Sequence, residues 1–343
     1  MKTALNRLLS YEQPQKYIVE TENYSETFST PVLTAGKSFI LGYTNETTGV
    51  YNGKESPVII FDDFTGDKKY VDFDFKVKSS AMKLLHKVNT SDNLKYLFYA
   101  LQSIKYTPFS HKRIWISEYS NFLIEYRHPQ EQNAIVLALD GINQAIYNKK
   151  QELFSLDELV KSRFIEMFGN PISEPKWIVK KWNDVLEIKN GKDYKKNLSD
   201  KGNGYPVYGS GGFMSIYADT YLCEGVITII GRKGNINNPL LVEGKIWNVD
   251  TAFGIIVKTD ILNPIFFHHC SKFYDYDKMN KATTIPSLTK SDLLNLEIIL
   301  PPIELQNEFA KFVKLIDKSK FIVQQQIKDL QELLDSKMDE YFR

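Results

Sequence analysis

The segment ELQNEFAKFVKLIDKSKFIVQQQIKDLQELLDSKMDEYFR, residues 304–343, contains no glycine and no proline. Its apolar residues recur at alternating intervals of three and four, which is the pattern of a helix that buries one narrow face. These seam positions are Phe309, Val313, Ile316, Val323, Ile327, Leu330, Leu334 and Tyr341, with Lys320 and Lys337 at the two positions between them. The pattern therefore predicts one long helix of the coiled-coil type.

The middle of the chain repeats this segment at a constant offset of 174 residues, as Leu156 and Leu330 illustrate. Further identical pairs are Gln132/Gln306, Asn133/Asn307, Ile142/Ile316, Glu158/Glu332, Leu159/Leu333, Ser162/Ser336, Glu166/Glu340 and Phe168/Phe342. The seam of this copy is Ile135, Leu139, Ile142, Ile146, Lys149, Leu153, Leu156, Val160, Arg163 and Met167. Gly141 is a candidate interruption of the helix. A repeat without gaps indicates that the two helices bury their seams against each other.

The duplication extends to the residues before each helix. PVLTAGKSFILGYTNETTGVY (31–51) resembles PVYGSGGFMSIYADTYL (206–222), VIIFDDFTG (58–66) resembles VITIIGRKG (226–234), and KSSAMKLL (78–85) resembles VDTAFGII (249–256). Alternation in YVDFDFKVK (70–78) predicts one strand with Asp72, Asp74, Lys76 and Lys78 on its polar face. VITII (226–230) reads as a buried strand, and LKYLFYALQSI (94–104) as a helix packed on a sheet.

These patterns predict an α+β fold with two similar strand-rich domains and an antiparallel pair of long helices, related by an internal pseudo-twofold axis. The expected boundaries are 1–127 and 171–301 for the domains, and 128–170 and 302–343 for the helices. A rod with a domain at each end suits a long polymeric ligand better than a small molecule.

Composition narrows the class of protein. With 343 residues, 43% hydrophobic and 25% charged, the chain is expected to form globular domains with large cores. It has no apolar stretch long enough for a membrane span, and its two cysteines, Cys223 and Cys270, exclude a disulfide framework, so we expect a cytoplasmic protein. The net charge of +1 gives no general attraction to nucleic acid, so such binding must come from local placement of charge.

Several catalytic motifs are incomplete. TAGKS (34–38) lacks the first glycine of a phosphate-binding loop, and GSGG (209–212) reads as a tight turn. NPIF (263–266) is not accompanied by a cofactor-binding glycine motif. HHC (268–270) has no second cluster to complete a metal site, so a structural role is favoured. Asp62, Asp63 and Asp67 leave open a metal-dependent nuclease, although acidic residues beside a glycine are ordinary turn formers.

Basic and amide side chains instead gather in glycine-rich loops. KNGKDYKKNLSDK (189–201) and GRKGNINN (231–238) offer lysines for phosphates, an arginine for guanine edges and asparagines for adenine edges. The alternative is a solvated surface. The predicted DNA contacts are Lys37, Tyr43, Asn45, Thr65, Lys68, Lys69, Lys112 and Arg113 in the first half, and Lys189, Lys192, Lys195, Lys196, Tyr208, Ser210, Arg232, Lys233 and Asn235 in the second.

With these loops and the duplicated helix, the whole chain resembles the specificity (S) subunit of type I restriction-modification systems. The resemblance rests on KWIVKKWNDVLEIKNGKDYKK (176–196), PVYGSGG (206–212), ITIIGRKGNI (227–236), VDTAFGI (249–255) and IPSLTKSDLLNLEIILPPIELQ (285–306), and in the first half on YEQPQKYIV (11–19), TPVLTAGKSFILGYTNE (30–46) and FDDFTGDKKYVDFDFKVKSSAM (61–82). In two places the first half departs from the second: it lacks counterparts of Trp177 and Trp182, and IWIS (114–117) replaces IPSL.

The resemblance implies a subunit without catalytic activity, whose two target recognition domains each read one half of a split, asymmetric site in double-stranded DNA. The helices are then the spacer and the docking platform for methyltransferase subunits, with restriction subunits joining the complex. It implies no cofactor or metal in this chain, while S-adenosylmethionine, ATP and Mg belong to the partners. The alternatives are the specificity subunit of a type IIB-like system, a self-contained endonuclease, and a scaffold that does not bind DNA.

Overall fold

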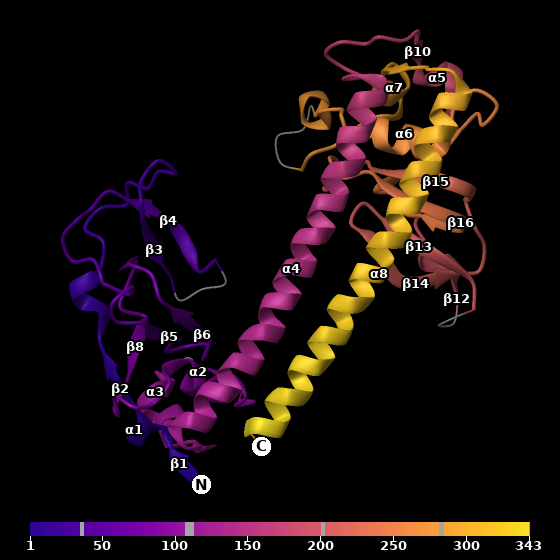
Figure 1. Cartoon of the computed structure of the whole chain (residues 1–343). Helices are drawn as coiled ribbons and strands as arrows, with labels where there is room; N and C mark the ends of the chain where they lie inside the picture. The colour runs from indigo at the N-terminus through magenta and orange to yellow at the C-terminus, as the bar shows by residue number, and fades with distance from the viewer. Residues whose placement is uncertain (35–37, 107–112, 200–202, 281–284, 343) are drawn as a thin grey trace. The chain divides into compact units, whose positions relative to one another are not determined.

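The computed structural model describes residues 1–34, 38–106, 113–199, 203–280 and 285–342 (Figure 1). Packing divides the chain into two compact units: unit 1 comprises Met1–Lys149 with Gln326–Arg343, and unit 2 comprises Lys150–Gln325. Each unit contains mostly antiparallel sheets, short helices and part of two long helices, so the predicted α+β class is confirmed. None of the helices in the described ranges combines the length and the apolar character that a membrane span requires.

The two long helices are α4 (Pro129–Phe168) and α8 (Ile303–Phe342), each of 40 residues. All predicted seam positions are buried or half-buried, whereas the off-seam residues Leu315 and Phe321 are 61% and 70% exposed. The predicted seams are therefore confirmed. The expected interruption at Gly141 does not occur, because this glycine lies on the exposed side of a continuous α4 with no other atom near its missing side chain. A single helical glycine costs only about 1 kcal/mol, which seam packing outweighs.

Within unit 2, the end of α4 runs antiparallel to the start of α8. The Arg163 guanidinium lies 3.3 Å from the Glu308 carboxylate, and the Lys320 ammonium lies 2.6 Å from Asp157. The residue numbers fall along α4 as they rise along α8, which is the antiparallel order. Lys320 therefore occupies a seam position without leaving a buried charge unpaired.

In unit 1, strands β1–β8 precede the helix α2 (Leu94–Gln102) in the chain and β9 follows it. This helix lies within the helix predicted over residues 94–104. The strands order as β2-β8-β5-β6, β4-β3-β7 and β1-β9. The elements are β1 (Lys2–Ala4), α1 (Leu5–Leu8), β2 (Leu9–Glu12), η1 (Pro14–Tyr17), β3 (Thr30–Leu33), β4 (Ile40–Thr44), β5 (Val58–Asp62), β6 (Lys68–Val71), β7 (Lys76–Val77), β8 (Met82–Lys87), α3 (Ile114–Ser117), η2 (Tyr119–Asn121) and β9 (Leu123–Glu125). Tyr96, Leu97 and Leu101 of α2 are buried in a core shared with β5 and β8.

Unit 2 repeats this arrangement with a larger sheet of order β11-β17-β15-β16-β13-β14-β12 and a two-stranded sheet, β10-β18. The elements are β10 (Val179–Lys181), α5 (Trp182–Val185), β11 (Leu186–Asn190), η3 (Lys195–Asn197), β12 (Leu198–Ser199), β13 (Tyr205–Gly209), β14 (Gly212–Ala218), β15 (Cys223–Gly231), β16 (Leu240–Asn248), β17 (Ala252–Val257), α6 (Pro264–Ser271), η4 (Tyr276–Met279), α7 (Lys290–Leu294) and β18 (Glu297–Ile299). The predicted strand 226–230 lies inside β15 and is almost wholly buried.

The prediction of one continuous strand over residues 70–78 is wrong. The segment forms β6 and β7 with a break between them, and Lys76, expected on the polar face, is 2% exposed. Its ammonium forms an ion pair with Glu46 and donates to the Thr48 carbonyl at 2.8 Å. The hydrogen bond from Lys76 lowers the pKa of the Glu46 carboxyl to about 2. A buried lysine is tolerated because its charge is paired and its donors are used.

The same three side chains attach each long helix to its unit, and we call this arrangement the helix clamp. In unit 1, the Gln132 amide oxygen accepts from the Asn93 N–H at 2.8 Å, and Asn93 donates to Asn133 at 2.8 Å. In unit 2 the corresponding residues are Asn263, Gln306 and Asn307, at 2.8 and 2.7 Å. Both clamp asparagines also cap a helix, α2 or α6. The clamp explains why glutamine and asparagine recur at the same place in both copies.

The opening of unit 1 matches that of unit 2 despite the missing tryptophans. The Leu5 N–H donates to the Phe122 carbonyl at 3.0 Å, as the Trp182 N–H donates to the Leu296 carbonyl at 2.8 Å. Leu5 and Trp182 are both fully buried at the start of a four-residue helix. Leu5 takes the place of Trp182 in the first half, so the aromatic signal is absent there.

Candidate nucleic-acid interface

Polar loops in unit 2 are held together by the turn between β16 and β17, residues 249–251. The Val249 N–H donates to the Tyr208 carbonyl at 3.0 Å, and the Arg232 N–H donates to the Thr251 carbonyl at 2.8 Å. Tyr208 lies near the end of β13 and Arg232 follows β15, so each bond ties a different loop to the turn.

Two further loops join the same group. The Lys192 N–H donates to the Asn248 carbonyl at 3.0 Å, and the Leu288 N–H donates to the Arg232 carbonyl at 2.9 Å. We call these loops together the loop cluster: residues 190–192, 208–212, 231–235, 249–251 and 285–288. Segments far apart in the sequence thus present one continuous group of backbone turns.

Glycines allow the loops of the cluster to approach so closely. A β-carbon on Gly191 would lie 1.8 Å from the Val249 carbonyl oxygen, and one on Gly231 would lie 2.0 Å from the Asn235 carbonyl oxygen. A β-carbon on Gly231 would also lie 3.1 Å from the Ser210 β-carbon, so the GSGG and GRKG turns are in contact. Side chains at these glycines would push the loops apart.

Six of the predicted DNA contacts lie on the loop cluster: Lys192, Tyr208, Ser210, Arg232, Lys233 and Asn235. Lys192, Arg232, Lys233 and Asn235 are exposed, while Tyr208 and Ser210 are half-buried. The guanidinium of Arg232 lies 5.9 Å from the centroid of the Phe253 ring, which leaves its N–H edges available to a ligand. Side chains of the types that can bind phosphates and read base edges therefore share one surface of unit 2.

The other predicted lysines of unit 2 are placed differently. Lys189 forms an ion pair with Glu187 at 2.6 Å, and this hydrogen bond raises the pKa of the lysine. Lys195 and Lys196 are exposed on η3, which follows the first loop of the cluster. Lys189 is thus already paired, whereas Lys195 and Lys196 extend the basic surface.

In unit 1, two predicted DNA contacts, Thr65 and Lys68, interact with the protein itself in or beside the turn over residues 62–67. The Thr65 hydroxyl donates to Asp62 at 2.7 Å, and Asp62 also accepts the N–H groups of Phe64 and Thr65 at 2.8 and 3.2 Å. Lys68 is half-buried with its ammonium 5.1 Å from the Tyr119 ring centroid, and burial lowers its pKa. Thr65 and Lys68 are therefore engaged with their own unit.

Asp63, a candidate metal ligand, is also committed to the structure. Its carboxylate lies 3.2 Å from the Lys83 ammonium and accepts the Trp115 N–H at 2.9 Å, and both charged side chains are buried. Asp62 is likewise held by the N–H groups and the hydroxyl of its own turn. Both neighbouring carboxylates that a nuclease site in this turn would need therefore already have partners within the protein. Over the ranges that the structure describes, no group of three or more His, Cys, Asp or Glu residues could hold a metal ion.

The remaining candidates of unit 1 form a looser set. Tyr43 is half-buried in β4 and Asn45 is exposed directly after it. Lys69 is exposed, with its ammonium 5.9 Å from the Phe39 ring centroid, and Arg113 is exposed before α3. Lys37 and Lys112 lie outside the described residues.

The match of IWIS to IPSL needs a correction of register. The Ile114 N–H donates to the Asp63 carbonyl at 3.0 Å, as the Leu288 N–H donates to the Arg232 carbonyl in unit 2. Ile114 therefore corresponds to Leu288, and the counterpart of IPSL is 111–114, of which 111 and 112 lie outside the described residues. In the corrected register, Arg113 of unit 1 corresponds to Ser287 of unit 2.

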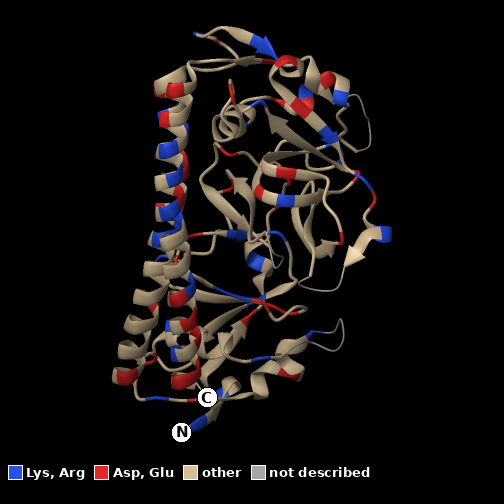
Figure 2. Ribbon diagram, turned by 90° about the vertical axis from the view of Figure 1, so that its right-hand side faces the viewer, with Lys and Arg blue, Asp and Glu red and all other residues tan. Residues whose placement is uncertain are grey.

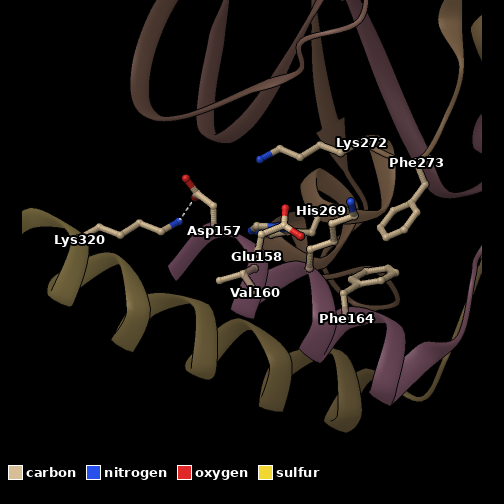
Figure 3. A pocket seen from close by; sticks show the side chains of 9 residues that line it. Asp157, Glu158, Val160, Phe164, His269, Lys272, Phe273 and Lys320 are labelled. Atoms are coloured by element: carbon tan, nitrogen blue, oxygen red, sulfur yellow. Dashed lines mark ion pairs between the residues drawn. The ribbon is translucent and has the colours of Figure 1, made fainter. Parts of the chain in front are cut away.

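A cavity of about 420 Å³ lies in unit 2 beside the helix seam (Figure 3). Figure 3 shows Lys320 and Lys272 on its wall, with Lys320 paired to Asp157, and the rings of Phe164 and Phe273 at one side. His269 also lines it, and burial lowers the pKa of this imidazole to about 3, so it is neutral at pH 7. The cavity gives the seam lysine room to reach its carboxylate.

The HHC stretch lies on α6 and serves the core of unit 2. His268 and Cys270 are buried, and burial lowers the pKa of His268 to about 2. Both cysteines of the chain are buried free thiols, and burial raises the pKa of Cys223 to about 11. These residues contribute packing and no reactive thiolate.

Charge on the long helices is mixed. Lys and Arg alternate with Asp and Glu along them (Figure 2), which agrees with the near-zero net charge of the chain. The loop cluster, where Lys192, Arg232 and Lys233 are exposed together, is therefore better suited to phosphates than the helices are.

Two exposed residues of unit 2 that the sequence did not mark as DNA contacts are apolar. Phe213 and Met214 directly follow the GSGG turn and are 45% and 40% exposed. Their signal in the sequence is a pair of large apolar residues beside a glycine turn that is flanked by basic loops.

Comparisons with known proteins agree with this geometry. A family model described as "Type I restriction modification DNA specificity domain" matches residues 174–332. The specificity subunit of the type I restriction enzyme EcoR124I/EcoR124II of Escherichia coli is 32% identical over 357 residues, which cover 92% of this chain and 85% of that protein. The crystal structure of a type I restriction-modification S subunit from M. genitalium covers 100% of this chain and 96% of its own, with 17% identity and a TM-score of 0.64. A structure from a study of complex assembly and conformational transition of the type I R-M system covers 99% and 98%, with 16% identity and a TM-score of 0.54.

Proposed function

Because the chain belongs to the DNA specificity subunits of type I restriction-modification systems, we propose that its two units each read one half of a split, asymmetric DNA site. The chain is a non-catalytic specificity subunit that assembles with methyltransferase and restriction subunits. The carboxylates of Asp62 and Asp63 interact with the Phe64 N–H and the Lys83 ammonium, which supports a non-catalytic role.

The loop cluster carries this proposal. It brings phosphate-binding lysines, a base-reading arginine and an amide to one surface, although they come from loops far apart in the sequence. Phosphate contacts supply affinity and base-edge contacts supply sequence preference, so one surface with both kinds of side chain suits specific duplex binding. A small-molecule site would need a concave, mostly apolar pocket instead.

In this proposal, residues 1–127 and 171–301 are the recognition domains, and 128–170 and 302–343 are the spacer helices. The exposed apolar residues of the helices in unit 2 offer a docking surface for methyltransferase subunits: Phe154, Phe321 and Ile322, which are 63%, 70% and 57% exposed. Cofactors of the complex belong to the partner subunits, and we assign S-adenosylmethionine to the methyltransferase and ATP with Mg to the restriction subunit. We place the assembled complex in the cytoplasm.

The test is duplex binding by the full chain with its methyltransferase partner. Selection from a randomised duplex pool should recover two short sequences at a fixed separation. Replacing Lys192, Lys195 and Lys196 together by Ala should weaken binding to every sequence and reduce the salt slope by about 0.9 for each phosphate that is no longer neutralised. Lys180 and Lys181 of β10, replaced by Ala, are the matched control. Binding that is independent of sequence and salt would favour a scaffold that does not bind DNA.

A further inference from the structure

The hairpin of β13 and β14 in unit 2 carries a large bulge. Pro206 pairs with Tyr217 and Tyr208 pairs with Phe213, so residues 214–216 stand opposite the single residue Val207. Ser215 in this bulge has a φ of 58°, the positive-φ non-glycine residue of the described chain. Such a backbone is uncommon for serine and persists where the surrounding structure holds it in place. The bulge therefore turns this part of β14 away from regular pairing with β13.

The equivalent hairpin of unit 1, β3 and β4, is bulged at the same place. Val32 pairs with Gly42 and Leu33 pairs with Ile40, which leaves Leu41 without a partner in the ladder. Both β3 and β13 pair in parallel with a later strand, β7 directly before β8 or β16 directly before β17, so the two hairpins occupy equivalent positions. A bulge in both copies indicates a feature of the fold rather than a local accident.

Both bulged strands display large apolar side chains. Phe213 and Met214 are 45% and 40% exposed in unit 2, and Ile40 and Leu41 are 42% and 43% exposed in unit 1. A bulge protects an exposed strand edge from pairing with other chains, and polar side chains would serve that purpose best. Exposed apolar side chains at these positions instead indicate a surface that a ligand covers.

The apolar residues of unit 2 adjoin the loop cluster. The ring of Phe213 lies 5.7 Å from the Tyr208 ring, centroid to centroid. The Met214 sulfur lies 3.4 Å from the place of a β-carbon on Gly209, beside Ser210. The hairpin therefore lies beside the turn with Arg232, and a ligand that covers both would carry anionic and apolar groups.

We propose that these bulged hairpins enter the major groove and that their apolar side chains read the methyl groups of thymines. This inference rests on the proposed function and assigns part of the base readout to Phe213 and Met214 in unit 2, and to Ile40 and Leu41 in unit 1. A major groove about 12 Å wide admits a two-stranded ribbon, and the thymine methyl is the apolar group that its base edges present. The basic residues of the loop cluster then lie beside the phosphates that flank the groove.

The experiment deletes single methyl groups from the DNA. Once selection has defined the target, each thymine is replaced in turn by uracil, which pairs identically and lacks only the methyl. At one or two positions of each half-site we expect the wild-type complex to lose about fourfold in affinity, the factor for one buried methyl-sized group. Met214→Ala should weaken binding to the thymine duplex and be nearly insensitive to uracil at that position. Leu41→Ala should do the same in the other half-site.

Ile178→Ala is the control, since Ile178 is 71% exposed in unit 2 and lies outside the loop cluster. It should keep the full thymine preference. Equal binding of thymine and uracil duplexes at every position, or a target without thymine, would overturn the inference while leaving sequence-specific binding intact. Loss of the same factor on both duplexes by Met214→Ala would also overturn it. Failure of the proposed function looks different, because binding would then show no sequence preference at all.

Discussion

Replacing Gln306 by Leu should destabilise unit 2 by about 3–5 kcal/mol, because the Gln306 side chain of the helix clamp is fully buried. The Gln306 amide donates to the carbonyls of Pro301 and Ile261 at 2.8 and 3.2 Å and accepts the Asn263 N–H at 2.8 Å. Leucine fills nearly the same volume but leaves these three backbone groups without a partner. Each unsatisfied buried group costs about 1–3 kcal/mol, and partial relaxation keeps the total below the simple sum.

Hydrogen exchange with urea unfolding is the suitable assay, since it reports the two units separately. We expect Gln306→Leu to reduce protection of amides in α6 and the sheet of unit 2, and Gln132→Leu to reduce protection in unit 1. Gln324→Leu is the matched control, because Gln324 is exposed on the same helix, α8. If Gln306→Leu changed protection no more than Gln324→Leu, the clamp would not anchor the helix.

Three further predictions concern the ligand, the spacer and pH. Arg232→Ala should cost about 1–3 kcal/mol on the selected target and relax the preference at one position, and equal losses on scrambled duplexes would make it a phosphate contact. Deleting residues 150–156 with 324–330 keeps the seam but shortens each helix by about 10 Å, so selection should recover the same half-sites about three base pairs closer, and survival of the original spacing would contradict a spacer role. His268 and His269 have pKa values of about 2 and 3 when folded against 6.5 when exposed, so below pH 6.5 the unfolded state gains protons that the folded state excludes. The free energy of unfolding should then fall as pH drops from 7.5 to 5.5, with a slope approaching about 1.4 kcal/mol per pH unit for each histidine. The urea midpoint should fall with it, and a constant midpoint would contradict this reading.

The seam could be predicted from the sequence because a heptad pattern depends only on spacing along one helix. Even Lys320 fits the prediction, since its partner Asp157 lies on the facing helix of the repeat. Exposed apolar residues such as Leu315 do not disturb the pattern, because they fall off its register. Local periodicity thus fixes which helical face is buried before any partner is known.

The sequence could not predict features that depend on distant partners. Lys76 reads as an exposed strand residue, and its burial requires Glu46, which lies 30 residues away in another loop. In the same way, only the fold shows that Lys68 lies over the ring of Tyr119, which is 51 residues away.

The hairpin bulges needed the register of strand pairing, which no composition or spacing reveals. Ser215 and Leu41 look like ordinary strand residues in the sequence, yet both stand out of the ladder. The basic and polar loops of the candidate interface are therefore visible in the sequence, whereas its apolar part is not.

The discontinuous make-up of unit 1 has a consequence for synthesis on the ribosome. Unit 2 is one uninterrupted stretch, 150–325, and has all its residues as soon as that stretch emerges. Unit 1 needs residues 326–342, whose Phe342 ring packs 5.3 Å from the Tyr96 ring in the first core. These residues are translated about 180 positions after 1–149, a delay of about 10–35 seconds at ordinary elongation rates. Throughout that interval the apolar surface that these residues cover is open, and a chain truncated before residue 326 should be cleaved by proteases in its first half rather than its second.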